Sequence, residues 1–162
     1  LYIGGFADKA LERVAQFGEG YFGHEGAHPR LAEIWAEKGR DADSLTVRIP
    51  DLFTAVAEDP EAALEELAPY YHHVNESYGA WANEDRALGM DSPGAVSMDL
   101  DAFKSSGTFQ VLTPEQAIAK LEKLRERVPV DHYMIMRPPG LPADRFRHYA
   151  QVLADKVLPA FA

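Results

Sequence analysis

The sequence contains no cysteine. This absence excludes disulfide bonds, thiolate nucleophiles and zinc sites built from cysteine. Basic residues are also scarce, because 16 lysines and arginines face 26 acidic residues and leave a formal net charge of −10. Such an acidic chain lacks the positive surface that attracts nucleic acids and anionic lipids. We therefore expect no nucleic-acid or membrane partner, and the lack of cysteine fits a protein of the reducing cytoplasm.

Long apolar runs are missing as well, and no segment has the length of a membrane span or the pattern of a secretory signal. Apolar residues make up 46% and charged residues 26% of the 162 residues, which is typical of a globular protein. The length suits a single domain, residues 1–162, better than two. Because the chain starts at Leu1 without methionine and directly in a strand-like run, we expect further sequence upstream.

Apolar residues follow the spacing of strands and helices in turn. The pattern predicts strands at 1–3, 21–22, 45–50 with a continuation to 56, and 130–136. It predicts helices at 7–17, around 31–38, from 60 onward, at 114–124 and at 143–158.

Several residues mark where these elements begin and end. Gly18 should end the first helix in a left-handed conformation. Asp59 is placed to cap the helix that Pro60 opens, and Pro69 should kink or break that helix. Residues 79–107 are rich in Gly, Ser, Asp and Asn, which predicts an irregular segment. Thr113-Pro114-Glu115-Gln116 is a capping box and predicts the start of a helix.

Strands that alternate with amphipathic helices indicate an α/β fold with a parallel sheet. About four βα units make half of a (β/α)8 TIM barrel, which needs roughly 250 residues when complete. We expect a partial barrel with a helical and loop insertion, residues 57–110, before its last unit. Four units would leave the first and last strands as open edges. A partner is therefore expected: a missing half or a second copy that completes the barrel.

The turn after the first strand has the features of an anion site. Gly4 and Gly5 let the backbone pass close to a ligand, because no Cβ stands in the way. The following helix begins with unpaired N–H groups and the positive end of its dipole, which suits a phosphate. An ordinary tight turn without a ligand remains the alternative.

Residues 24–28 match the H-E-x-x-H pattern of zinc proteases. Gly23 and Gly26 weaken a helix there, and Pro29 disfavours a helical conformation at His28. We expect no metal site. The segment is better interpreted as a loop after a strand, in which His24 or His28 could contact substrate or cofactor.

Other polar residues have plainer interpretations. His72 and His73 are adjacent on a helix and point in different directions, which suits a solvated face better than a metal site. His132 could lie inside a barrel, but packing is the default interpretation. Arg137 follows the last strand and so lies near the active face of a barrel, where it could bind an anion or pair with a carboxylate.

Three stretches resemble the luciferase-like flavin-dependent monooxygenases. They are Leu1-Tyr2-Ile3-Gly4-Gly5 with the following helix to Tyr21, Thr113 to Met134, and Pro138 to Pro142 with Lys156-Val157-Leu158-Pro159. Glu19 stands where the family usually has Asp. The resemblance covers essentially the whole chain and matches it to the C-terminal half of the family's barrel.

The resemblance implies an oxidoreductase that uses reduced FMN and O₂ to oxygenate a small organic substrate. F420 is the alternative cofactor, with hydride transfer in place of oxygenation. It also implies that Gly4, Gly5 and Phe6 contact the phosphate-bearing tail of the flavin, and that a flavin reductase is a possible partner. The family's catalytic residues lie mostly in the N-terminal half, so none is assigned here. Two alternatives stay open: a non-catalytic flavin binder, and a subunit that assembles only with a partner.

Overall fold

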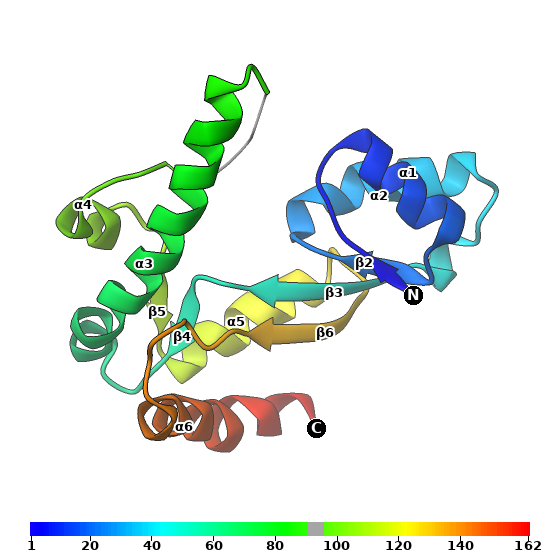
Figure 1. Ribbon diagram of the computed structural model, residues 1–162. Coiled ribbons are helices and arrows are strands. Elements are labelled where there is room, and N and C mark those ends of the chain that lie inside the picture. The colour runs from blue at the N-terminus through cyan, green and yellow to red at the C-terminus, as the bar shows by residue number, and fades with distance from the viewer. Residues whose placement is uncertain (91–95) are drawn as a thin grey trace. The chain divides into compact units, whose positions relative to one another are not determined.

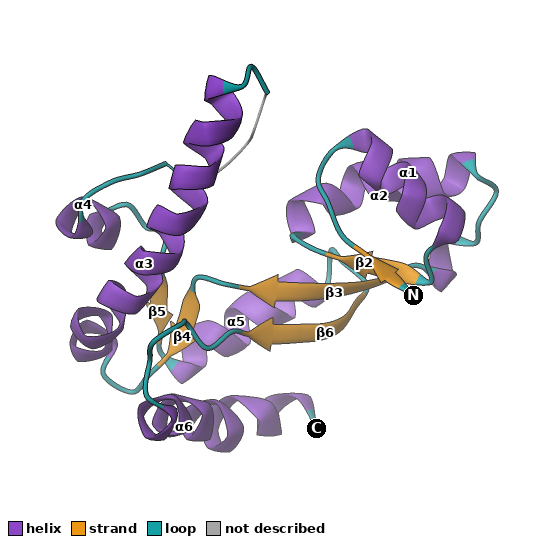
Figure 2. Ribbon diagram, viewed as in Figure 1, coloured by secondary structure: helices purple, strands orange, loops and turns teal. Residues whose placement is uncertain are grey.

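The computed structural model describes residues 1–90 and 96–162. The chain forms two compact units. Unit 1 contains residues 1–51 and 119–136, and unit 2 contains residues 52–118 and 137–162. Figure 1 traces the chain through both units, and Figure 2 colours its helices and strands.

Unit 1 is built on a sheet of four parallel strands in the order β1-β2-β3-β6. The strands are β1 (Tyr2–Ile3), β2 (Gly20–Phe22), β3 (Thr46–Asp51) and β6 (Val130–Ile135). Helices α1 (Asp8–Phe17) and α2 (His28–Glu37) connect successive strands, and α5 (Pro114–Arg125) precedes β6. The expected α/β fold with a parallel sheet is confirmed, and β1 and β6 are the edge strands of this sheet.

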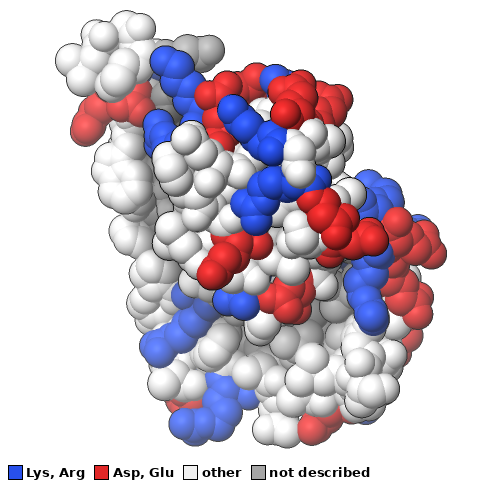
Figure 3. All heavy atoms as spheres, turned by 90° about the vertical axis from the view of Figure 1, so that its right-hand side faces the viewer, with Lys and Arg blue, Asp and Glu red and all other residues white. Residues whose placement is uncertain are grey.

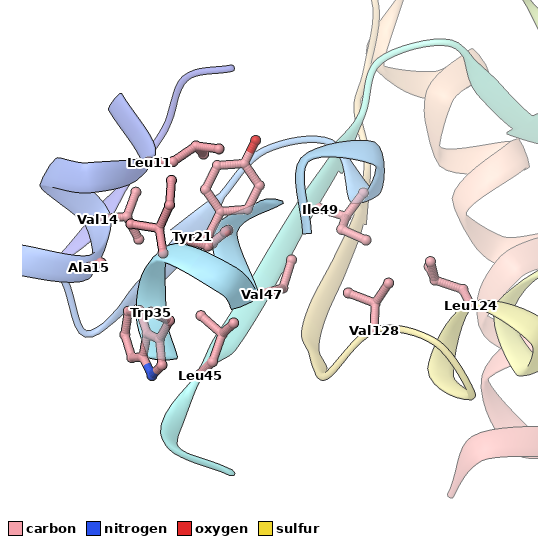
Figure 4. Packing of buried hydrophobic residues seen from close by; sticks show 12 residues of the cluster. Leu11, Val14, Ala15, Tyr21, Trp35, Leu45, Val47, Ile49, Leu124 and Val128 are labelled. Carbon is pink, nitrogen blue, oxygen red and sulfur yellow. The ribbon is translucent and has the colours of Figure 1, made fainter. Parts of the chain in front are cut away.

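One face of this sheet carries the core of unit 1. Side chains alternate along each strand, so that every second one points to the same face. Figure 4 shows the resulting cluster, in which α1 and α2 cover the strands. Its members are less than a tenth exposed: Leu11, Val14, Ala15, Tyr21, Leu31, Ile34, Trp35, Leu45, Val47, Ile49, Leu124 and Val128. This packing fixes the strands and therefore the loops at their carboxyl ends.

The opposite face of the sheet is polar and partly exposed. We call it the open face and define it by Tyr2, Phe22, Thr46, Arg48, Asp131 and His132. The exposed fraction is 39% for Phe22 and, for side chains alone, 35% for Arg48 and 56% for His132. Parallel sheets are normally covered on both faces. An exposed face of this kind is therefore where a ligand or another piece of protein would bind.

Unit 2 is mostly helical. Its two-stranded parallel sheet joins β4 (Thr54–Val56) and β5 (Gln110–Leu112). Its helices are α3 (Pro60–Ala87), α4 (Leu100–Ser105) and α6 (Ala143–Val152). The expected continuation of the third strand to Val56 is wrong, because the chain leaves β3 at Asp51 and Thr54 pairs with Gln110. Strand β5 had no counterpart in the sequence prediction.

Helix α3 differs from the prediction in two ways. It runs without interruption from Pro60 through Pro69 to Ala87. Pro69 is exposed, so water can replace the backbone hydrogen bond that proline cannot make. The expected irregular segment 79–107 is thus helical at its start and again in α4, while residues 91–95 lie outside the described residues. The cap is as predicted, because Asp59 accepts a hydrogen bond from the Ala62 amide at 3.1 Å.

Other helix ends can be compared with their sequence signals. The capping box is confirmed: the Gln116 amide donates to Thr113 Oγ1 at 3.2 Å, and the Thr113 amide donates to Gln116 Oε1 at 2.9 Å. Gly18 is extended, with φ −86° and ψ 155°, so the left-handed prediction was wrong. It leads the chain directly into β2. The last helix is α-helical only to Val152 and continues as the π-helical turn Leu153–Val157 and the 3₁₀ turn Leu158–Phe161.

The surface carries both signs of charge. On the face drawn in Figure 3, basic and acidic side chains of the described residues intermingle, without a large region of one sign. Within residues 1–90 and 96–162, no helix combines the length and apolar character needed to cross a bilayer.

Candidate functional site

The carboxyl ends of the strands in unit 1 meet at one edge of the sheet, because all four strands are parallel. Gly4-Gly5-Phe6 follows β1, Gly23-His24 follows β2, and Met136 follows β6. Ligands of open α/β sheets and of barrels bind at this edge. The three residues predicted to contact a cofactor thus lie where that fold class places its site.

Gly4 and Gly5 both need to be glycine. A Cβ on Gly4 would lie 2.7 Å from the carbonyl oxygen of Phe22, closer than real contacts allow. Gly5 has a φ of +126°, and a Cβ there would lie 2.5 Å from the Ala10 Cβ. The turn is thus a tight passage of backbone between β1 and α1, with no side chain at Gly4 or Gly5.

Tyr21 holds this turn through a hydrogen bond from the core of unit 1. Its ring is fully buried in the core of unit 1, and its hydroxyl donates a hydrogen bond to the Gly5 carbonyl at 3.1 Å. In Figure 4 this hydroxyl lies at the margin of the cluster. Burial raises the pKa of Tyr21 above its ordinary value, so the hydroxyl stays protonated and remains a donor at neutral pH. The core therefore holds the position of the turn.

The N-terminus of α1 completes the turn. The amides of Ala10 and Leu11 donate to the Ala7 carbonyl at 2.7 and 3.1 Å, while those of the preceding residues point out of the helix end. Asp8 lies in the first turn, and Arg30 of α2 donates to its carboxylate at 2.9 and 3.2 Å. Arg30 also donates to Glu33 at 2.9 Å, so it offsets only part of the negative charge at this end of α1. The turn therefore fits a phosphate group held by backbone amides, beside the 65% exposed ring of Phe6.

A strip of polar contacts crosses the open face from β1 to β6. The Tyr2 hydroxyl lies 3.0 Å from Thr46 Oγ1 and donates to Asp131 Oδ2 at 3.3 Å. Arg48 lies over the Tyr2 ring, 3.8 Å from its centroid, and donates to Asp131 through Nε at 3.0 Å. Tyr2 spans the sheet because Gly20 of β2 has no side chain: a Cβ there would lie 2.6 Å from the Tyr2 ring.

A bulge in β6 places two consecutive residues on this strip. Val47 pairs with Val130 and Arg48 pairs with His132, so Asp131 is the extra residue between them. Bulges of this kind redirect side chains and are common beside active sites. His132 Nδ1 lies 2.9 Å from Asp131 Oδ2. His132 and Arg48, in that order, hold the pKa of Asp131 below its ordinary value, so Asp131 remains a carboxylate and accepts from both.

The two histidines of the H-E-x-x-H match do not share a helix. His24 is extended, and its Nδ1 accepts a hydrogen bond from the Gly26 amide at 3.0 Å, which caps the 3₁₀ turn Glu25–Ala27. His28 is helical, with φ −58° and ψ −45°. Pro29 was expected to disfavour this conformation, but His28 adopts it as the first residue of α2. The steric restriction before proline is a bias, and Pro29 itself is tolerated in the first turn, where its missing N–H would have no intrahelical acceptor. Within the described ranges 1–90 and 96–162, no group of three or more suitable side chains could hold a metal ion.

The remaining predicted residues make local contacts. Arg137 Nε donates to the carbonyl of Leu141 at 2.9 Å and so holds the turn before α6. His72 and His73 both lie on α3, as predicted, and His72 Nε2 lies 2.6 Å from the Met98 carbonyl. These contacts hold Arg137 and His72 within unit 2, while His73 is exposed on the same helix.

Sequence reasoning missed Arg48, Thr46 and Tyr2 as members of one cluster. The alternation in Thr46-Val47-Arg48 was available as a signal, because it places Thr46 and Arg48 on the face opposite the buried Val47. The bulge at Asp131 had no recognisable sequence signal, and the reach of Tyr2 depends on which strand lies beside β1.

The fold, and the turn at the carboxyl edge of its sheet, define a class of protein. It is an α/β domain with a parallel sheet and a glycine turn after a strand. The family model for luciferase-like monooxygenases matches residues 1–132. The chain belongs to the luciferase-like monooxygenase family. No curated protein matches the sequence.

Solved structures share this fold at low sequence identity. The coenzyme F420-dependent tetrahydromethanopterin reductase from Methanopyrus kandleri has a TM-score of 0.62 and 16% identity over 99% of this chain and 50% of its own. Riboflavin lyase, solved with modified FMN and riboflavin, has a TM-score of 0.63 and 16% identity over 98% and 42%. A long-chain alkane monooxygenase has a TM-score of 0.60 and 15% identity over 98% and 39%. The chain spans half or less of the length of these structures.

Proposed function

We propose that the chain supplies the C-terminal half of a (β/α)8 barrel in a flavin-dependent oxidoreductase, which uses reduced FMN and O₂ to oxygenate a small organic substrate. The observation that carries this proposal is the glycine turn at the carboxyl edge of β1, in a chain that belongs to the luciferase-like family. F420 with hydride transfer is the alternative, because solved structures of this fold include F420-dependent proteins.

In this proposal Gly4, Gly5 and Phe6 hold the phosphate-bearing tail of the cofactor. The cofactor supplies the redox chemistry. The turn binds the phosphate through backbone amides, and the open face contacts the rest of the ligand. Phe6 packs its exposed ring against the ligand and excludes water from that side.

The binding site is tested by comparing FMN with riboflavin, which lacks the phosphate. Hydrogen bonds to a charged group predict that FMN binds about 10- to 100-fold more tightly, as measured by quenching of flavin fluorescence. Phe6→Ala should weaken FMN binding by about three- to tenfold. Phe17→Ala is the matched control, because Phe17 is 62% exposed at the other end of α1. Equal binding of FMN and riboflavin would contradict a phosphate site at the turn.

A second candidate function is flavin binding without turnover. It needs only the glycine turn, because no catalytic residue is assigned in this chain. Mixing the chain with FMN, a reductant and an aldehyde distinguishes the two, because turnover supports the oxygenase and tight binding without turnover supports the binder. Absence of binding would favour a subunit that acts only with a partner.

The partner in this proposal is the other half of a barrel, either an N-terminal segment or a second copy. It would add strands to the edges β1 and β6 of the sheet. Light scattering of the purified chain tests whether a second copy is the partner. If it is, the molar mass should be that of a stable dimer. A well-folded monomer would exclude the second copy.

A further inference from the structure

We propose that His132 contacts the flavin-type cofactor on the open face, with Asp131 as the residue that positions its ring. This inference rests on the proposed function and assigns it a further residue. It is carried by three observations: the level of His132 on the sheet, the contacts of its ring, and the bulge that places it there.

His132 lies at the same level of the sheet as the glycine turn. Phe22 pairs with Arg48, and Arg48 pairs with His132. Gly4 lies against the carbonyl of Phe22 at the other end of this row. A ligand whose phosphate is held by the turn would therefore extend over the open face past His132, with 56% of that side chain exposed to meet it.

The contacts of the ring define what it can offer. Nδ1 faces Asp131 at 2.9 Å, so in the neutral ring Nδ1 carries the proton and Nε2 is left as an acceptor. Nε2 can then receive a hydrogen bond from an N–H or O–H group of the ligand, such as the imide of a flavin ring or a hydroxyl. A carboxylate that holds the other nitrogen fixes this tautomer, as it does in sites where histidine acts on a ligand.

Asp131 is itself held firmly for this task. Tyr2 and Arg48 donate to the same carboxylate oxygen that faces His132. The three contacts come from β1, β3 and β6, so the carboxylate is fixed by the sheet and not by one flexible neighbour. The ring of His132 is therefore oriented before any ligand arrives, which lowers the cost of binding.

Two substitutions at position 132 separate a ligand contact from a structural role. His132→Asn keeps a donor near Asp131 but does not reach the ligand, whereas His132→Gln reaches the position of Nε2. We expect His132→Asn and His132→Ala to weaken FMN binding by about three- to tenfold, and His132→Gln to retain most of it. The opposite order, with Asn retaining binding and Gln losing it, would mean that His132 serves only to hold Asp131 and would overturn the proposal.

The tautomer gives a readout that needs no cofactor. Nitrogen NMR of the histidine rings should show the neutral His132 ring protonated at Nδ1, and Asp131→Asn should shift it toward an even mixture of tautomers. Protonation at Nε2 in the parent chain would overturn the proposal. His73→Ala is the control for FMN binding, because His73 is an exposed histidine of α3 in unit 2.

The outcomes distinguish this inference from the proposed function. If the parent chain binds FMN and Phe6→Ala weakens binding, but every variant at position 132 binds normally, the role of His132 is wrong and the phosphate site stands. If the parent chain binds neither FMN nor F420, the cofactor site at the glycine turn fails, and the role of His132 fails with it.

Discussion

The two units solve the problem of stability differently. Unit 1 has four strands in one sheet and a mainly aliphatic core under α1 and α2. Unit 2 has two strands of three residues each. Its core combines alanines and leucines with aromatic rings, and the ring centroids of Tyr71 and Phe109 are stacked 4.1 Å apart. A two-stranded sheet gives little stability by itself. The comparison teaches that unit 1 draws its rigidity from strand pairing, whereas unit 2 depends on ring packing and on side chains that hold the backbone.

The candidate site follows this division. It lies on and beside the regular sheet of unit 1, where hydrogen-bonded strands fix the positions of Arg48 and His132 and the end of β1 from which the turn at Gly4 begins. Sites on strands hold their geometry more precisely than sites on loops. The predictions below test whether the two units differ as described.

The largest effect is expected from the buried tryptophan of unit 1. Trp35 is fully buried, and its Nε1 donates to the Asp41 carbonyl at 2.9 Å. Trp35→Ala should lower the free energy of unfolding by about 4 kcal/mol, as measured by urea denaturation. The control is Trp81→Ala in unit 2, where 58% exposure predicts a change within about 0.5 kcal/mol. Equal effects would show that unit 1 has no dominant core.

The next effect compares one glycine from each unit. Gly5→Ala should cost about 3 kcal/mol, because the residue has a φ of +126° and no room for a Cβ. Gly140→Ala should cost about 1 kcal/mol less. Its φ of +82° is also unfavourable, but an added Cβ would lie 3.5 Å from the Tyr70 ring, an ordinary contact. Thermal unfolding of the two variants measures the difference. A smaller cost for Gly5→Ala would mean that the turn is not tightly packed.

A smaller effect is expected where unit 2 holds its backbone. Asn75 of α3 is 1% exposed, and its amide donates to the Val96 carbonyl at 3.0 Å. Asn75→Ala should destabilise the protein by about 2 kcal/mol, because it leaves that carbonyl without its donor. The amide of Met98, which donates to Glu76 Oε1 at 2.9 Å, should then exchange its hydrogen faster. Unchanged exchange would show that Asn75 does not hold this segment.

The smallest effect is a pH dependence at an ion pair of unit 2. Arg145 donates to Glu66 through Nε at 2.6 Å, and Tyr149 donates to the same carboxylate at 2.8 Å. The hydrogen bond from Arg145, which has the larger effect, and that from the Tyr149 hydroxyl lower the pKa of Glu66 below its ordinary 4.5. Its stabilisation is therefore present above pH 4.5 and is lost as the pH falls through the folded-state pKa.

Glu66→Gln tests this pair. It should cost less than about 1 kcal/mol at pH 7, because the pair is largely exposed, and the difference from the parent chain should vanish in acid. Urea denaturation at both pH values measures it. Burial, and next the hydrogen bond to Glu66, raise the pKa of Tyr149 to about 12. The Tyr149 hydroxyl therefore remains a donor at both acidic and neutral pH. A difference that persists in acid would contradict the assigned pair.

Much of unit 1 was predictable from the sequence, because its elements are read from local patterns. Alternation in β3 and helical spacing in α1 both give the observed elements. The capping box at Thr113, in unit 2, was equally local and equally predictable. The glycine turn was also predictable, since two glycines after a strand have few other uses. Its role as a cofactor site stays a prediction.

The missed features depend on contacts between distant segments. Strand β5 has three residues and exists because it pairs with β4, which no local pattern records. Pro69 was expected to kink or break α3. The break does not occur, because the exposed position of Pro69 lets water replace the lost hydrogen bond. The strip on the open face joins Tyr2 to Asp131 across 129 positions of sequence. Strand order and register decide that contact, and neither could be predicted from composition or spacing.

The absence of a side chain at Gly20 allows Tyr2 of β1 to reach Asp131 of β6. The Tyr2 ring and the Thr46 hydroxyl both occupy the space above Gly20, where an alanine Cβ would lie within 2.6 Å of each. In relatives with a larger residue at this position, the tyrosine must turn away, and the aspartate in the last strand loses one of its donors. Substitutions at positions 2, 20 and 131 should therefore occur together among related sequences.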